Sequence, residues 1–161
     1  MDMPFRKGVM AGLAALLAVS SGVAEARAPS RPAVASASRH PVSNLPVIAL
    51  TAGGHRLRVE LAASSAEQET GLMFRARMGA DEGMLFPMSP PRQAYFWMRN
   101  TIIPLDIIFI GADRRVLNVA ANARPYDETP LPSAGKAAAV LELNGGRAAQ
   151  LGIRAGTKVS W

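Results

Sequence analysis

Short segments in which apolar and polar residues alternate follow one another along most of the chain. Arg56 to Leu61 is the clearest case, because its two leucines and Val59 fall on one side and its charged residues on the other. A period of two is typical of a β-strand with one buried face. Val47 to Thr51 is a second apolar segment, and the intervening Gly53-Gly54 suits a tight turn. The sequence therefore predicts that the folded domain opens with a β-hairpin.

Further segments with the length and apolar content of strands follow this hairpin. They are Gly83–Met88, Gln93–Arg99, Leu105–Ile110, Arg115–Ala121, Ala138–Asn144 and Thr157–Trp161. Pro90-Pro91 separates the first two of them, because proline cannot donate a hydrogen bond to a neighbouring strand. Residues 122–136 contain three prolines, so we expect a long loop there.

Only two segments indicate helix, and both are short. Ser64 and Glu67 have the spacing of a capping box, which also occurs one residue later, and Gly71 closes the segment. We expect a helix over residues 65–70 and a helical turn near residues 147–151. Seven or eight short strands with so little helix predict a mainly β protein, a small single-domain β-sandwich or barrel.

The first residues have the features of a secretory signal peptide. Arg6 and Lys7 form a basic start, an uncharged run follows, and Ala24-Glu25-Ala26 places small residues where signal peptidase reads. A membrane anchor is the competing interpretation, but the uncharged stretch from Gly8 to Ala24 is marginal in length and includes polar residues. We expect cleavage after Ala26, export to the periplasm or the exterior, and no membrane span in the mature chain.

The signal peptide would occupy residues 1–26, and the segment after it has a different composition. Residues 27–46 are rich in Ala, Ser, Pro and Arg and lack an apolar period, so we expect a disordered tether there. The folded domain would then occupy residues 47–161. A domain of this size is large enough to bury one core without disulfides.

The amino-acid composition excludes several kinds of functional site. The chain has no Cys, which excludes disulfides, thiolate metal sites and cysteine nucleophiles, and only two His. Its formal net charge of +6 is unchanged by signal cleavage and favours anionic partners. The alternative is that scattered arginines only keep the protein soluble. Export argues against nucleic acid, so the expected partners are a small molecule, a glycan or an envelope protein, without a cofactor.

Residues that could bind a ligand concentrate in the middle of the domain. In the strand expected over Gln93–Arg99, the side chains of Tyr95, Trp97 and Arg99 share one face. Such a stripe could stack on a sugar or another flat ligand, or it could simply cover a second apolar layer. The ligand-binding candidates of this region are Arg75, Trp97, Arg99, Asn100, Thr101 and Asp106.

Asp106 interrupts an apolar strand, where it would share a face with Ile108 and Ile110. A carboxylate in such surroundings must be paired, or its pKa rises. Arg99 or Arg75 is the expected partner. Two interpretations stay open: a carboxylate that clamps its own loop through a buried ion pair or backbone N–H groups, and an acid, base or ligand-binding group.

Glu142 repeats this pattern, because it lies beside Val140 on one face of an apolar strand. If Asp106 and Glu142 converged, they would form the paired-carboxylate site of a glycoside hydrolase, so both are weak catalytic candidates. Methionines are frequent between Met73 and Met98, and thioethers bind Cu(I), but Met is also ordinary core filler. We expect no metal site.

Four blocks carry a resemblance to a known family. They are Gly71-Leu72-Met73-Phe74-Arg75, Gly83-Met84-Leu85-Phe86, the string from Phe96 to Asp106, and the string from Val140 to Gly146. In this order they resemble the signature of the DUF192 family, also called UPF0127, over about residues 47–161. The resemblance implies a small, often exported, mainly β protein of jelly-roll-like topology without an established activity. Family members often carry a Cys pair in the loop that matches residues 122–136, and this chain has none.

Our first hypothesis is therefore an exported cell-envelope protein, a non-catalytic binding or accessory module that uses the region of Trp97, Arg99 and Asp106. One alternative is an envelope glycan hydrolase with Asp106 or Glu142 as acid or base. The other is a purely structural accessory protein whose polar residues only stabilise the fold.

Overall fold

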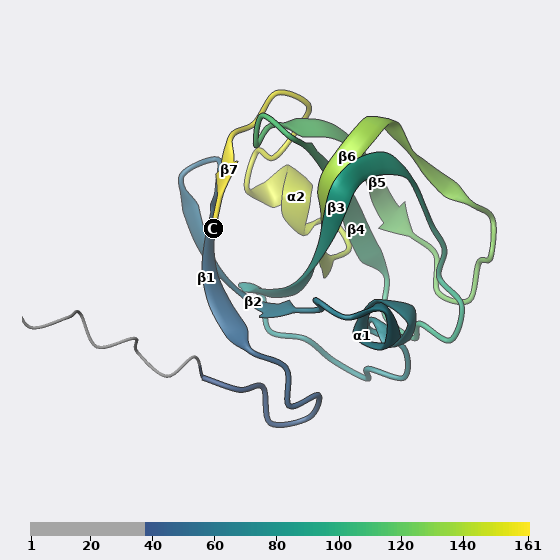
Figure 1. Cartoon of the computed structure of the whole chain (residues 1–161). Helices are drawn as coiled ribbons and strands as arrows, with labels where there is room; N and C mark the ends of the chain where they lie inside the picture. The colour runs from purple at the N-terminus through teal and green to yellow at the C-terminus, as the bar shows by residue number, and fades with distance from the viewer. Residues whose placement is uncertain (1–37) are drawn as a thin grey trace, which may run out of the picture. The chain divides into compact units, whose positions relative to one another are not determined.

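A computed structural model of the chain describes residues 38–161, which form a mainly β domain with seven strands and two short helices (Figure 1). The strands are β1 (Val47–Ala52), β2 (His55–Leu61), β3 (Glu82–Phe96), β4 (Leu105–Gly111), β5 (Val116–Ala123), β6 (Leu131–Asn144) and β7 (Val159–Ser160). The helices are α1 (Ser65–Thr70) and α2 (Arg147–Gln150).

All seven strands belong to one curled sheet with the order β5-β4-β6-β3-β2-β1-β7. Every pair is antiparallel except β2 and β3, which are parallel and connected through α1. The two edges of the sheet meet where the Val116 N–H donates to the Thr157 carbonyl at 2.9 Å and the Val159 N–H donates to the Arg114 carbonyl at 2.8 Å. Apart from these contacts β5 and β7 are the ends of the sheet, which is curled into a half-barrel, and this confirms the expected mainly β class.

The opening hairpin and the first helix form where the sequence predicts them. Gly53 and Gly54 occupy the turn with φ of +57° and +87°, a conformation that glycine adopts without strain. At α1, the Glu67 N–H donates to the Ser64 hydroxyl at 3.3 Å and the Ser64 N–H donates to the Glu67 carboxylate at 2.7 Å. This reciprocal pair satisfies N–H groups that a helix N-terminus leaves unpaired, so the capping box is confirmed.

Apolar side chains cover both faces of the central strands. One core cluster includes Leu50, Ile108, Leu141 and Ala148, so α2 packs within the curl of the sheet (Figure 1). The other cluster covers the opposite face, and its largest residues are Met84, Phe86, Met98, Leu105, Ile107 and Phe109. Every residue of β4 is buried, because the strand lies between these two layers. The long apolar run of β4 is typical of a strand buried on both faces.

The structure joins two of the predicted strands into one. Gly83–Met88 and Gln93–Arg99 are not separate strands: β3 passes through Pro90-Pro91 and ends at Phe96. The prolines lie in an exposed stretch where the pairing of β3 with β6 shifts register, between Pro87 and Arg92. At such a bulge the missing proline N–H leaves no ladder hydrogen bond unmade.

The long loop expected over residues 122–136 is also mostly strand. β5 extends to Ala123, and β6 begins at Leu131, which leaves only residues 124–130 as a loop. Pro132 is tolerated because β6 pairs with β4 only from Ala137 onward, so one edge of its first half has no neighbouring strand. The Asn118 side chain covers that edge by hydrogen bonds to the Pro132 carbonyl and the Ala134 N–H.

The segment expected to be a disordered tether is folded over its described part, residues 38–46. Arg39 forms a β-bridge with Pro46, and the Val47 N–H donates to the Ser38 carbonyl at 2.7 Å. The expected signal peptide and residues 27–37 lie outside the described residues. Within residues 38–161, neither helix has the length and apolar character needed to cross a membrane.

Candidate ligand-binding site

A pocket of about 730 Å³ opens beside α1, on the face of the sheet that carries Phe86 and Met98. Its walls come from α1 with the turn that follows it and from the second half of β3 with the loop after it. We call this site the aromatic pocket; it is lined by Ala66, residues 68–74, Phe86, Met88, residues 92–97, residues 99–101 and Glu142.

The rim of the aromatic pocket is formed by large aromatic side chains that the fold leaves exposed. Phe74, Tyr95 and Trp97 are 71%, 60% and 49% exposed. The alternation predicted for the strand is confirmed, because Ala94 and Met98 are buried while Tyr95 and Trp97 face outward. The Trp97 side chain is only half-buried, so part of its ring is accessible to a ligand. Exposed aromatic groups that line one pocket are characteristic of a binding surface.

Arg99 lies beside this rim and contacts both Trp97 and Glu128. Its guanidinium carbon is 5.5 Å from the centre of the Trp97 ring, and its Nη2 lies 2.8 Å from a carboxylate oxygen of Glu128. The Arg99–Glu128 pair is exposed, so its contribution to stability is small. Its effect is to hold the guanidinium over the indole.

Two tight turns position the rim. The Phe74 N–H donates to the Asn100 carbonyl at 2.8 Å, and both residues have positive φ, +60° and +52°. Asn tolerates this conformation, whereas an exposed Phe in it is strained. The Thr101 N–H donates to the Met98 carbonyl, and the Met98 N–H donates to the Asp127 carbonyl. The rim is thereby attached to the 124–130 loop.

Glu142 lies at the buried end of the aromatic pocket. It is 5% exposed, and its partners across the sheet are Met84 on β3 and Ile107 on β4, both apolar. Its side chain makes no hydrogen bond or ion pair with any residue of the described part of the chain. Burial raises the pKa of Glu142 to about 8, because the apolar surroundings disfavour the charged form. The carboxyl group therefore keeps its proton at neutral pH.

Asp106 is fully buried and has a different role. Its Oδ1 accepts N–H groups from Asn122 at 2.8 Å and Gly146 at 3.0 Å, and its Oδ2 accepts the Ala148 N–H at 2.7 Å. The carboxylate therefore joins the end of β5 to the first turn of α2. The prediction that Arg99 or Arg75 pairs with it was wrong, because backbone N–H groups fill its hydrogen-bonding positions. Asp106 does not line the aromatic pocket.

The register of β4 and β6 separates the two candidate catalytic acids. Ile107 pairs with Glu142 and Asp106 pairs with Leu143. Directly paired residues of antiparallel strands point to the same face, and successive residues point to opposite faces. Asp106 and Glu142 thus lie on opposite faces of the sheet, and the paired-carboxylate site of a glycoside hydrolase is not formed by these two residues.

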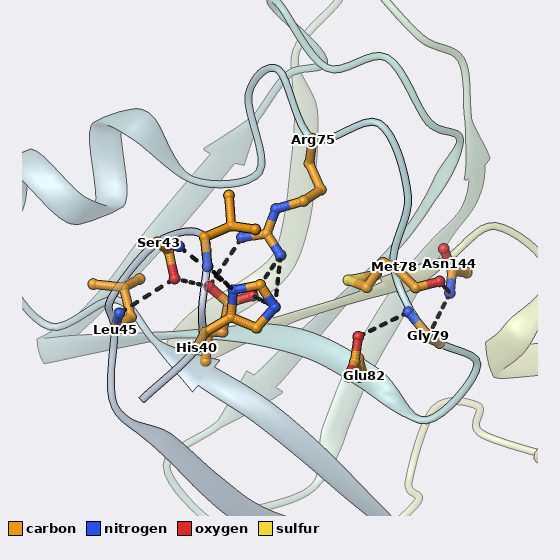
Figure 2. Close-up of polar contacts among 10 residues, drawn as sticks. His40, Ser43, Leu45, Arg75, Met78, Gly79, Glu82 and Asn144 are labelled. Carbon is orange, nitrogen blue, oxygen red and sulfur yellow. Dashed lines mark hydrogen bonds and ion pairs between the residues drawn. The ribbon is translucent and has the colours of Figure 1, made fainter. Parts of the chain in front are cut away.

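Arg75 also lies away from the aromatic pocket. It is 9% exposed and forms a bidentate pair with the buried Glu60, with Nη1–Oε1 and Nη2–Oε2 distances of 2.7 and 3.0 Å. His40 and Ser43 from the N-terminal segment join this cluster, since the Ser43 hydroxyl donates to Glu60 and the His40 ring lies 3.4 Å from Arg75 (Figure 2). Burial alone would raise the pKa of Glu60, but hydrogen bonds from Arg75 and Ser43 outweigh it and lower that pKa.

Four of the six predicted ligand-binding residues therefore line one pocket: Trp97, Arg99, Asn100 and Thr101. Arg75 and Asp106 do not, since each is occupied by a structural contact elsewhere. Sequence reasoning missed the contribution of α1 and the exposure of Phe74, although Phe74 stands in one of the blocks singled out above. Met84 and Met98 are buried in the core.

Replacement of Asp106 by Asn tests its structural role. The amide keeps one acceptor oxygen but turns a donor toward backbone N–H groups, so we expect the free energy of unfolding to fall by about 3 kcal/mol and the Tm by roughly 10 °C. Thermal and urea unfolding measure both. The matched control is Asp113→Asn, because the exposed Asp113 accepts a single turn N–H, from Arg115. Equal effects of the two substitutions would contradict the role assigned to Asp106.

Glu142 predicts a pH dependence of stability. Its pKa is about 8 in the folded state and 4.5 in its ordinary state. Between these values the unfolded chain loses a proton that the folded chain keeps, so each pH unit costs the folded state about 1.4 kcal/mol. The lowered pKa of Glu60 acts only below about 4.5, where stability falls with decreasing pH. Glu142→Gln should therefore gain stability over the native protein as pH rises from 5 to 8 and level off above 8. Urea unfolding at each pH measures this difference, and equal slopes for the two proteins would contradict the assignment.

Comparison with known proteins gives the family of this chain. The family model of DUF192, described as "Uncharacterized ACR", matches residues 48–161. A protein of unknown function from Novosphingobium aromaticivorans DSM 12444 is 60% identical, with a TM-score of 0.76 over 80% of this chain and 94% of that one. A candidate transcription regulator from Sinorhizobium meliloti 1021 is 40% identical, with a TM-score of 0.66 over 71% of this chain and 90% of that one. No curated protein matches. Because the family model covers nearly all of the described domain, the chain belongs to the DUF192 family.

Proposed function

We propose that this protein is an exported cell-envelope protein that binds a small organic ligand in the aromatic pocket. The observation that carries the proposal is the pocket itself, with exposed Phe74, Tyr95 and Trp97 at its rim and the unpartnered Glu142 at its buried end. Its volume of about 730 Å³ lies in the range of sites for small molecules. Such sites combine apolar walls with a few polar groups that orient the ligand.

The arrangement supports binding better than either alternative considered for this chain. A glycan hydrolase would need two acids at one site, and the pair considered above lies on opposite faces of the sheet. A purely structural protein would have no use for three exposed aromatic rings around one pocket, because exposed apolar surface favours aggregation. Rings of this kind stack on flat or sugar-like ligands, so an envelope glycan or another small envelope compound is the proposed class.

The N-terminal sequence supports the location. Arg6 and Lys7, the uncharged run after them and Ala24-Glu25-Ala26 have the order of a secretory signal peptide. An exported binding protein would meet its ligand in the envelope, and the partner could also be an envelope protein that inserts a side chain into the aromatic pocket.

Fluorescence of Trp97 provides a direct test of binding. The chain has two Trp residues, so a Trp161→Phe variant reports on Trp97 alone. We expect one or more members of a panel of monosaccharides, soluble envelope glycan fragments and small aromatic compounds to change this fluorescence in a saturable way. By calorimetry, Trp97→Ala should weaken the same binding about fivefold or more, since ring stacking contributes about 1 kcal/mol or more.

The matched control for this test is Tyr126→Ala. Tyr126 is an exposed aromatic residue of similar size that does not line the aromatic pocket. Its removal should leave the affinity unchanged. If removal of Tyr126 and of Trp97 weakened binding equally, the ligand would not occupy the proposed pocket.

Export has its own test. When the full chain is produced in a bacterial host, we expect the protein in the periplasmic fraction with a mass that corresponds to loss of residues 1–26. Ala26→Asp should block cleavage, because signal peptidase requires a small residue before the cleaved bond. Intact-mass measurement of the fractionated protein decides the point, and an uncleaved native chain confined to the cytoplasm would refute the proposal.

A further inference from the structure

The buried end of the aromatic pocket holds a carboxyl group that the rest of the structure does not use. Glu142 lies among apolar neighbours on β3 and β4, and no hydrogen bond or ion pair within the described residues satisfies its oxygens. The other buried acids of the domain differ in this respect, since Glu60 is paired with Arg75 and Asp106 accepts three backbone N–H groups. The carboxyl oxygens of Glu142 are not enclosed in the core, because they reach the space of the pocket, where a ligand can supply the partner that the described residues do not.

Neither cation of the pocket is paired with Glu142. Its basic residues are Arg92 and Arg99, both exposed on the β3 side, and no ion pair joins either of them to Glu142. Arg99 is held by Glu128 instead. The positive partner that would suit an ionised Glu142 therefore has to come from the ligand.

The walls of the pocket favour the same kind of ligand. The faces of aromatic rings carry negative electrostatic potential and attract cations, most strongly when the site is shielded from water. Trp97, Tyr95 and the buried Phe86 line the same pocket as Glu142 and supply such rings to it. A carboxylate combined with aromatic walls is the arrangement that recognises ammonium groups.

We infer that the ligand of the aromatic pocket is an organic ammonium ion, whose apolar part contacts the aromatic walls and whose N–H groups donate to the Glu142 carboxylate. This inference rests on the proposed function, because it names the ligand class of the same site. When the ammonium ion enters, Glu142 releases its proton to solvent, and the N–H groups replace that proton on the carboxylate oxygens. An anionic ligand is disfavoured, since it would meet Glu142 without a free cation at the buried end.

Proton release makes binding depend on pH, and few other groups interfere. The titratable groups that line the pocket besides Glu142 are Glu69 on α1, Arg92 and Tyr95 on β3, and Arg99 after β3. Across the sheet, Glu142 faces only the apolar Met84 and Ile107. The affinity for an ammonium ion should therefore rise about tenfold per pH unit between pH 6 and 8 and then level off.

The experiment compares three probes of similar size with the purified protein that carries Trp161→Phe. The probes are 2-phenylethylammonium, 2-phenylethanol and 3-phenylpropionate, which are a cation, a neutral molecule and an anion. Titrations followed by Trp97 fluorescence should give an affinity for the cation at least tenfold above that for either other probe at pH 8. Calorimetry at pH 7 in buffers with different ionisation enthalpies should detect close to one proton released per bound cation.

The Glu142→Gln variant tests the contribution of the carboxylate separately from that of the rest of the pocket. The amide resembles the protonated acid in shape, so the variant should fold, bind 2-phenylethanol as the native protein does, and lose at least tenfold in affinity for the cation at pH 8. Asp113→Asn is the matched control, because this exposed acid does not line the pocket. Its effect should be less than threefold.

The failure of this inference can be told apart from the failure of the proposed function. If the alcohol bound as tightly as the ammonium ion, or if Glu142→Gln left the affinity for the cation unchanged, the ligand would not be an ammonium ion but the binding site would stand. If no probe changed the Trp97 fluorescence up to its solubility limit and the wider panel also failed, both would be overturned.

Discussion

The antiparallel register between β4 and β6 determines what each buried acid of this domain can do. Because Ile107 pairs with Glu142, the neighbouring Asp106 must point to the other face of the sheet. One carboxyl group is thereby directed at α2 and the other at the aromatic pocket. A shift of one residue in this pairing would exchange the two faces along the whole strand and separate Asp106 from the backbone N–H groups that it accepts, so the register is strongly specified.

Three buried acids illustrate three ways in which a protein accommodates a carboxyl group. Asp106 accepts hydrogen bonds from backbone N–H groups and so joins the end of β5 to the first turn of α2. Glu60 is satisfied by an arginine and a serine, and this cluster attaches the N-terminal segment to the sheet (Figure 2). Glu142 has no partner among the described residues, and its burial raises its pKa to about 8, so that it keeps its proton at neutral pH. The first two acids stabilise the fold, whereas the third is available for a ligand.

The different surroundings of these acids explain why the string of residues after Phe96 is not a single site. Trp97, Arg99, Asn100 and Thr101 follow one another around a turn beside the aromatic pocket, and the chain then enters the core at Leu105. Asp106 comes directly after that entry and faces α2. Residues close in sequence thus serve two purposes, a rim for ligand and a clamp for the fold. A fold shared with structures of unknown function does not choose between activities, and only the geometry of the site supports a proposal.

Local features of the sequence were sufficient for much of the fold. The alternation in β2, the glycines of its hairpin and the capping box of α1 act over a few residues, so they are readable without tertiary structure. The sequence also predicted that Tyr95 and Trp97 share a face and that Glu142 stands among apolar neighbours.

The continuity of β3 through two prolines could not be predicted, because it depends on β6 supplying a partner on both sides of the bulge. Whether Arg75 meets Asp106 or Glu60, and whether two acids 36 positions apart share a face, was decided only by the packing of strands distant in sequence. A long charged side chain can reach several neighbours, and the tertiary structure alone selects which one it meets.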